Sequence, residues 1–177
     1  MGITLMRKYL LQHAKGHVLE ICCGTGRNLS YYPSDCRITA TDASAKMLET
    51  AASKTGPQAS FYQMESEHLN FPSDSFDTVV DTFGLCSVDD PVKVLKEMKR
   101  MCKKDGQLLL LEHGQSDYPW LQFILDKYAP KHAMRWGCIW NRRILTFLEQ
   151  AELEIVTLRR FHFNSTYYII AKPVASE

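Results

Sequence analysis

Short apolar runs alternate with amphipathic stretches along most of the chain. The apolar runs have the length and composition of strands, and they cover residues 18–22, 37–41, 59–64, 76–82, 107–112, 153–161 and 165–171. The segments between them predict helices at residues 5–14, 28–32, 45–54, 91–105, 116–131 and 141–150. Strands that alternate with helices predict a parallel sheet that is covered on both faces.

Two strand segments refine this picture. Residues 107–112 are mostly leucine without polar alternation, which is typical of a strand buried on both faces. The last two strands are separated only by residues 162–164, so we expect an antiparallel hairpin at one edge. The predicted fold class is therefore α/β: a Rossmann-like, seven-stranded, mostly parallel sheet with helices on both faces and a C-terminal antiparallel hairpin. No repeat or linker divides residues 1–177, which predicts a single domain.

Charge and hydropathy exclude several classes of protein. The chain has 177 residues and a formal net charge of +1, so it has no bulk attraction for nucleic acid. No apolar run approaches the roughly 20 residues that a membrane-spanning helix needs. The N-terminal residues also lack a secretory pattern. We expect a soluble, intracellular, cytoplasmic protein without nucleic-acid partners and without an integral membrane segment.

The six cysteines form no C-x-x-C pair, so their spacing indicates neither a zinc site nor a thioredoxin-like centre. Most of them lie in apolar surroundings, where a reduced cysteine packs as a small hydrophobic side chain. We therefore expect a metal-free, fully reduced protein that is a monomer or a weak dimer.

Glycines and acidic residues at the ends of the first two strands point to a cofactor. The first strand ends near Glu20 and breaks into a turn with Gly24 and Gly26, and the second strand ends in Asp42. This set predicts a nucleotide-type cofactor at the carboxyl ends of two neighbouring parallel strands. The turn lets the backbone approach the ligand, and the carboxylate of Asp42 offers two acceptors to a ribose diol.

The pattern differs from those of dinucleotide and nucleoside-triphosphate sites. A G-x-G-x-x-G fingerprint would place its third glycine at position 29, which is Leu29. No basic residue adjoins Asp42 to meet a 2′-phosphate, and no Gly-Lys-Ser/Thr follows the turn. The remaining pattern resembles motif I of the class I S-adenosylmethionine-dependent methyltransferases.

This resemblance implies S-adenosylmethionine as the cofactor, S-adenosylhomocysteine as its product, and further contacts. Glu65 and Ser66, after the third strand, are expected at the adenine, with Glu67 as the competing acid. The set of cofactor residues that we predict is Glu20, Cys22, Gly24, Gly26, Asp42, Ala43, Met47, Glu65, Ser66, Thr82 and Phe83. Residues 1–15 would form a short N-terminal helix, residues 16–114 the cofactor-binding half and residues 115–177 the acceptor-side half.

The resemblance extends from about residue 16 to 172. With motif I, residues 82–88, 111–114 and 136–141 resemble the fungal mitochondrial OXA-suppressor methyltransferases and the animal methyltransferase-like thiol S-methyltransferases, in the ubiquinone/menaquinone-biosynthesis-like branch. Cys22 stands where motif I has its first glycine, and its side chain is expected to crowd the methionine end of the cofactor. Relatives usually carry a longer N-terminal segment, so a mitochondrial location is the alternative if such a segment has been removed.

The acceptor is a small, largely apolar molecule in this interpretation, methylated at sulfur, oxygen or carbon. No Asn/Asp-Pro-Pro-Tyr follows residue 81, which argues against methylation of nucleic acid or of amide nitrogen. His113 is the candidate base because it follows a buried strand and imidazole titrates near neutral pH. Residues 115–143 hold aromatic and basic side chains, and we expect them to form the acceptor wall. A catalytically weak cofactor-binding module that acts as a protein partner and a protein methyltransferase are the alternatives.

Overall fold

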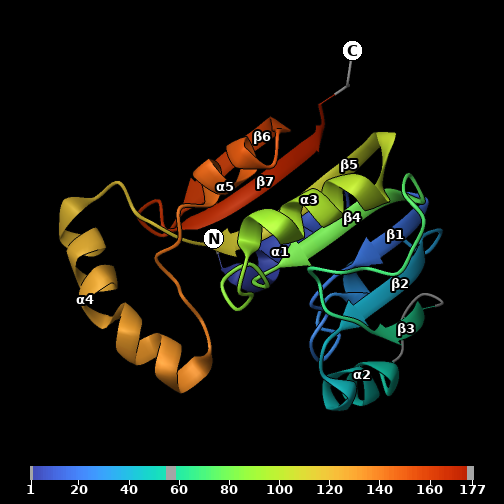
Figure 1. Ribbon diagram of the computed structural model, residues 1–177, viewed down its shortest axis with the longest axis horizontal. Coiled ribbons are helices and arrows are strands. Elements are labelled where there is room, and N and C mark those ends of the chain that lie inside the picture. Colours follow the sequence, from blue (N-terminus) through green and yellow to red (C-terminus); the bar gives the residue numbers. More distant parts are fainter. Residues whose placement is uncertain (1, 55–58, 175–177) are drawn as a thin grey trace.

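The computed structural model describes residues 2–54 and 59–174. Within these residues a seven-stranded sheet has the order β3-β2-β1-β4-β5-β7-β6 (Figure 1). The strands are β1 (His17–Glu20), β2 (Arg37–Asp42), β3 (Ala59–Gln63), β4 (Phe76–Thr82), β5 (Cys102–His113), β6 (Leu153–Phe161) and β7 (Thr166–Pro173). β1 to β5 pair in parallel, and β7 is antiparallel to both β5 and β6. The predicted fold class is confirmed.

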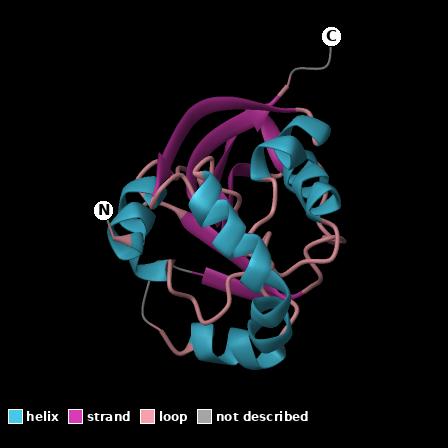
Figure 2. Ribbon diagram, turned by 90° about the vertical axis from the view of Figure 1, so that its left-hand side faces the viewer, coloured by secondary structure: helices cyan, strands magenta, loops and turns pink. Residues whose placement is uncertain are grey.

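Helices lie on both sides of the twisted sheet (Figure 2). They are α1 (Ile3–Leu11), α2 (Ala45–Ala52), α3 (Pro91–Met101), α4 (Pro119–Trp136) and α5 (Ile144–Gln150), with a 3₁₀ turn η1 (Leu29–Tyr31). None of the described helices combines the length and the apolar character that crossing a membrane requires.

The two faces of β5 belong to two different apolar cores. Leu108 and Leu110 pack in a core with α3 and α5, whereas Leu109 and Leu111 pack in a core with α1 and α2. All four leucine side chains are fully buried. Because successive side chains of a strand point to opposite faces, a run of leucines fills both cores at once, as the sequence predicts.

Two predicted boundaries are wrong for identifiable reasons. The helix expected at residues 28–32 is only the single 3₁₀ turn η1, because Pro33 holds Tyr32 in an extended conformation (ψ 146°). The helix expected to reach residue 105 ends at Met101, and Cys102 already pairs with Phe76 at the start of β5. The chain therefore enters the sheet directly from the helix.

The predicted helix 116–131 is displaced toward the C-terminus. α4 begins at Pro119, where a missing N–H is harmless, and continues through Pro130 to Trp136. Gly137 ends it with a left-handed φ of +65°. In Figure 1 this helix lies apart from the sheet, and Ala129 is its buried residue.

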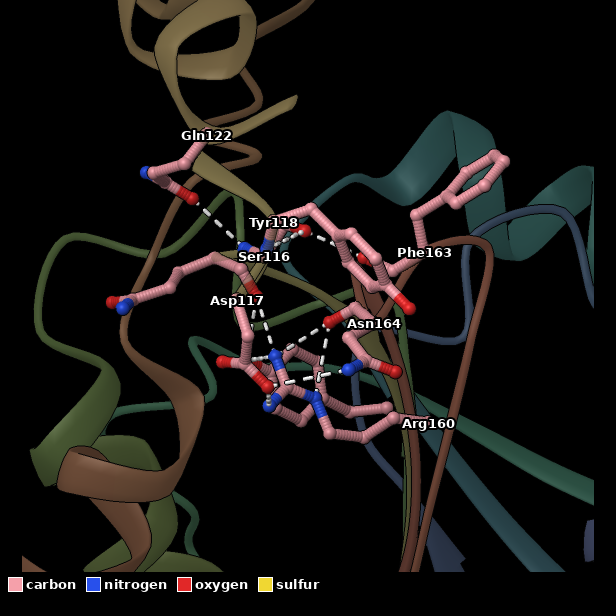
Figure 3. A network of polar contacts seen from close by, with 9 residues as sticks. Ser116, Asp117, Tyr118, Gln122, Arg160, Phe163 and Asn164 are labelled. Carbon is pink, nitrogen blue, oxygen red and sulfur yellow. Dashed lines mark hydrogen bonds and ion pairs between the residues drawn. The ribbon is translucent and has the colours of Figure 1, made fainter. Parts of the chain in front are cut away.

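Arg160 of β6 anchors the segment that joins β5 to α4 (Figure 3). Its guanidinium donates to the carbonyl oxygens of Gln115 (2.9 Å) and Asn164 (2.6 Å) and to the Tyr167 hydroxyl (2.9 Å). It also pairs with the carboxylate of Asp117. The end of β5 and the β6–β7 turn are thus held to one another by one cation.

We expect Arg160→Ala to lower the free energy of unfolding by about 2–3 kcal/mol, because partly buried carbonyl and hydroxyl groups lose a charged donor. Arg159→Ala is the matched control, since this neighbouring side chain is exposed. Urea unfolding of the two variants should separate them. Equal stabilities would show that the Arg160 contacts contribute little.

Candidate active site

The turn after β1 places backbone that no side chain covers at the carboxyl edge of the sheet. Gly24 and Gly26 have left-handed φ values of +54° and +68°. A β-carbon on Gly24 would meet no atom within 4 Å, whereas one on Gly26 would lie 3.0 Å from the Ala51 Cβ. Gly24 therefore leaves space for a ligand, and Gly26 allows the turn to pack against α2. Cys22, at the position of the motif's first glycine, also has a positive φ of +49°.

Asp42 joins the ends of β1 and β2. Its Oδ2 accepts from the Gly24 N–H at 2.8 Å, and its Oδ1 accepts from the Ser44 N–H at 2.9 Å. These two bonds orient the carboxylate and leave each oxygen with a further lone pair. The carboxylate can therefore accept from a ligand hydroxyl while it holds the turn in place.

A cavity of about 410 Å³ lies beside this turn. Eight predicted cofactor residues line it, namely Cys22, Gly24, Asp42, Ala43, Met47, Glu65, Ser66 and Phe83. Both candidate adenine acids are there, because Glu67 lines the cavity together with Glu65. Among the described residues that line it, the charged ones are all acidic: Asp42, Glu65, Glu67 and Asp89. Such a lining suits a cation better than a phosphate.

Sequence reasoning missed several lining residues of this first cavity. Ser44, Met64, Gly84, Ser87, Val88 and Asp89 also line it. Most of them belong to the loop after β4, which carries part of the family resemblance but has no nucleotide-binding motif of its own. The place of this loop in the fold could have identified these residues, because loops at the carboxyl ends of parallel strands converge on one site.

Three other predicted cofactor residues, Glu20, Gly26 and Thr82, are outside the lining of this first cavity. Glu20 is buried, and its two oxygens accept from the Asn28 amide (2.9 Å) and the Tyr32 hydroxyl (2.8 Å). The Thr82 hydroxyl accepts from Asn28 at 3.0 Å, and Gly26 lines a neighbouring cavity. Glu20 and Thr82 thus hold the loop after β1, and their contact with a cofactor stays a prediction.

Burial raises the pKa of Glu20 from 4.5 to about 7, against the lowering effect of Tyr32 and Asn28. The neutral carboxyl is therefore favoured in the folded state, and the stability that it contributes is lost as the pH rises from the unfolded toward the folded pKa. We expect the free energy of unfolding to fall by about 2–3 kcal/mol more in the wild type than in Glu20→Gln between about pH 5 and pH 8. Chemical unfolding at several pH values measures this difference, and parallel curves would contradict the raised pKa.

A second cavity of about 750 Å³ adjoins the first one, and Phe83 lines both. Arg7, Arg27, Lys54 and His113 also line it, so its charged groups are mainly basic. The guanidinium of Arg7 donates to Asn28 Oδ1 at 2.7 Å and lies 5.0 Å from the centre of the Phe83 ring. α1, which supplies Arg7, therefore forms one wall of this cavity.

The segment that we expect to form the acceptor wall, the described residues 115–143, lies outside the lining of this second cavity. The α4 side chains of Trp120, Phe123 and Trp136 are 53%, 66% and 66% exposed. The aromatic residues of α4 therefore face solvent, and the role of this segment in acceptor selectivity stays a prediction.

Two buried carboxyl groups, Asp81 and Glu112, lie near the ends of β4 and β5. Glu112 Oε1 accepts from the Phe83 N–H at 2.9 Å, while Glu112 Oε2 and both Asp81 oxygens have no partner among the described residues. Burial raises the pKa of Asp81 to about 7, and burial with the neighbouring Asp81 raises the pKa of Glu112 well above its ordinary range. The protonated form of Glu112 is therefore favoured by its burial and by the neighbouring Asp81, and its Oε1 still holds the Phe83 N–H.

His113, the predicted base, lies where β5 ends and lines the second cavity. Its ring centre is 5.2 Å from that of Phe83, and its Nε2 is 2.9 Å from the Cys138 sulfur. The imidazole is thus placed beside a residue that both cavities share. One of its nitrogens is already engaged, so its action as a base stays a prediction.

Comparison with known proteins agrees with this geometry. The family described as "Methyltransferase domain" matches residues 19–110. The mitochondrial methyltransferase OMS1 of Saccharomyces cerevisiae is 35% identical over 190 residues, which cover 94% of this chain and 40% of that protein. The human thiol S-methyltransferase TMT1B is 33% identical over 162 residues, which cover 85% of this chain and 66% of that protein. The chain therefore spans less than two thirds of the length of these relatives.

Solved structures support the fold independently. A methyltransferase from Methanosarcina mazei, described as dependent on S-adenosylmethionine, superposes with a TM-score of 0.71 at 21% identity and covers 97% of this chain and 98% of its own. The match of the family to more than half of the sequence, together with the glycine turn and the sheet order, identifies the fold and the cofactor class. The chain belongs to the class I S-adenosylmethionine-dependent methyltransferases.

Proposed function

We propose that this chain transfers the methyl group of S-adenosylmethionine to a small, largely apolar acceptor at sulfur, oxygen or carbon. The observation that carries the proposal is the pair of adjoining cavities that share Phe83. The first has acidic charged groups and the second has mainly basic ones. Two such cavities can hold a cationic cofactor and a separate acceptor next to each other.

The residues of the first cavity fit the cofactor. S-adenosylmethionine carries a sulfonium and an ammonium group, and the charged side chains that line this cavity are acidic. Asp42 would hold the ribose diol, Glu65 and Ser66 the adenine, and the open backbone at Gly24 the methionine part. Bound there, the cofactor supplies an activated methyl group, and the protein contributes mainly alignment and exclusion of water.

The second cavity fits an acceptor with an ionisable nucleophile. Ile3, Tyr31 and Phe83 give it apolar walls, while Arg7 and Arg27 bring positive charge. Positive charge stabilises a thiolate or a phenolate, which are stronger nucleophiles than the neutral groups. Of the three acceptor atoms, sulfur and oxygen therefore agree best with these walls. TMT1B is described as a thiol S-methyltransferase, which supports a thiol among the first acceptors to test.

A radiolabelled methyl donor tests the proposal. The purified chain should transfer label to members of a panel of small thiols, phenols and quinols, with S-adenosylhomocysteine as a competing product. Arg7→Met should raise the acceptor KM, and Lys8→Met, which changes an exposed neighbour, should leave it unchanged. Binding of S-adenosylhomocysteine without transfer to any small acceptor would favour a cofactor-binding module, and label on proteins would favour a protein methyltransferase.

One observation favours a partner for this chain in addition to an acceptor. α4 exposes Trp120, Phe123 and Trp136 on a helix that lies apart from the sheet. A helix with this much exposed aromatic surface is suited to contact with another surface.

OMS1 is described as mitochondrial, so for the whole protein we propose an intracellular location, in mitochondria or the cytoplasm.

A further inference from the structure

Three potential metal ligands meet beside the second cavity. Cys86 follows β4, His113 ends β5 and Cys138 follows α4. Their ligand atoms all lie within 4.8 Å of one another, and the His113 Nε2 is 2.9 Å from the Cys138 sulfur. Among the described residues, this is the set of three histidine, cysteine or acidic side chains that could share an ion.

Backbone hydrogen bonds hold the three segments together. The Ile139 N–H donates to the Cys86 carbonyl at 2.8 Å, which ties the loop after α4 to the loop after β4. The Gln115 N–H donates to the Arg142 carbonyl at 3.0 Å, which ties the same loop to the end of β5. The cluster is therefore set by main-chain contacts and does not depend on side chains alone.

We propose that Cys86, His113 and Cys138 bind a zinc ion. Two thiolates and an imidazole nitrogen form a common ligand set for zinc, and softer ligands select it over magnesium or calcium. Zinc with Zn–N and Zn–S bonds of about 2.0 and 2.3 Å separates such ligands by about 3.6 Å in a tetrahedron. Side-chain shifts of less than about an ångström would bring the three atoms to that spacing.

The surroundings suit a neutral metal centre. The cysteine side chains are 3% and 8% exposed, and two thiolates balance the charge of a zinc ion. The Ser87 hydroxyl lies 3.4 Å from the Cys86 sulfur, where it can donate to a metal-bound thiolate. Three protein ligands leave one tetrahedral position for water or a small molecule, which is the arrangement of zinc sites with an open position.

The zinc site goes beyond the proposed methyl transfer and does not depend on it. An imidazole that binds zinc through Nε2 has no free lone pair on that atom, so His113 would then act as a ligand and not as a base. The sequence-based expectation of a metal-free protein came from the absence of closely spaced ligands. In the folded chain, three segments that are far apart in the sequence bring the ligands together instead.

Metal content and a cobalt spectrum test this proposal on the whole chain. After reconstitution with zinc and gel filtration, we expect one ion per chain by elemental analysis. Cobalt in place of zinc should give thiolate-to-metal charge-transfer absorption in the near ultraviolet. Cys86→Ser and Cys138→Ser should each lose most of this band, and His113→Asn should lower zinc affinity at least tenfold. Cys36→Ser, which alters a buried cysteine outside the cluster, should keep both signals.

Circular dichroism and S-adenosylhomocysteine binding show whether each variant is folded. A folded wild type that takes up neither zinc nor cobalt would overturn the proposal. So would a charge-transfer band that survives in Cys86→Ser and Cys138→Ser, because the ion would then lie elsewhere. A Cys86–Cys138 disulfide in protein kept under reducing conditions, found by mass spectrometry, would also overturn it.

Discussion

Asp42→Ala is expected to weaken binding of S-adenosylhomocysteine ten- to a hundredfold, or by about 1.5–3 kcal/mol. The change removes the two acceptors that a ribose diol would use. It also removes the partners of the Gly24 and Ser44 N–H groups, which the carboxylate holds at 2.8 and 2.9 Å. The ligand therefore loses direct contacts and a turn that is already shaped for it. Calorimetric titration measures the loss.

Two further variants separate the loss of the ribose contact from damage to the turn. Asp35→Ala removes an equal charge from an exposed position away from the cavity and should leave the affinity unchanged. Asp42→Asn keeps one acceptor oxygen, so its affinity should fall between those of wild type and Asp42→Ala. Unchanged affinity in Asp42→Ala would remove Asp42 from the site. Tight binding of NAD by the wild type would contradict the cofactor class itself.

The cofactor side of the molecule was predictable because its signals are local in sequence. The leucines of β5 indicate burial on both faces, and they fill two cores. The glycine turn and Asp42 each follow a strand directly, so the parallel order of the sheet brings them together. The same reasoning did not foresee that the Glu20 oxygens accept from Asn28 and Tyr32, and the contact of Glu20 with a cofactor stays a prediction.

The acceptor side was harder to predict because its contacts join distant segments. Arg7 reaches Asn28 from α1, 21 residues earlier in the chain. Cys86, His113 and Cys138 show no metal-binding spacing, yet main-chain contacts between loops bring their ligand atoms within 4.8 Å. The bounds predicted for α4 were also wrong. The helix extends past Pro130 and ends only at Gly137, the next residue that favours a helix end.

If His113 is the base, His113→Asn has the largest expected effect, a fall in turnover of about 10²–10⁴ with a phenol acceptor. His113 lines the second cavity beside Phe83, where an imidazole could take a proton from an acceptor. The first cavity is not lined by His113, so S-adenosylhomocysteine should bind almost unchanged. A thiol acceptor is already partly ionised near neutral pH, and its turnover should fall much less. Steady-state kinetics with both acceptors measure these effects.

Substitution by cysteine distinguishes the two roles of this imidazole. His113→Cys keeps a zinc ligand but removes the base, whereas His113→Asn removes both. If His113 acts as a ligand, zinc should restore much of the turnover to His113→Cys and none to His113→Asn. If it acts as a base, both variants should stay slow with zinc, and the limb of the pH–rate profile that reports the imidazole should disappear. His13→Asn, at an exposed histidine, serves as the control. Wild-type turnover in both His113 variants would exclude His113 from the acceptor step.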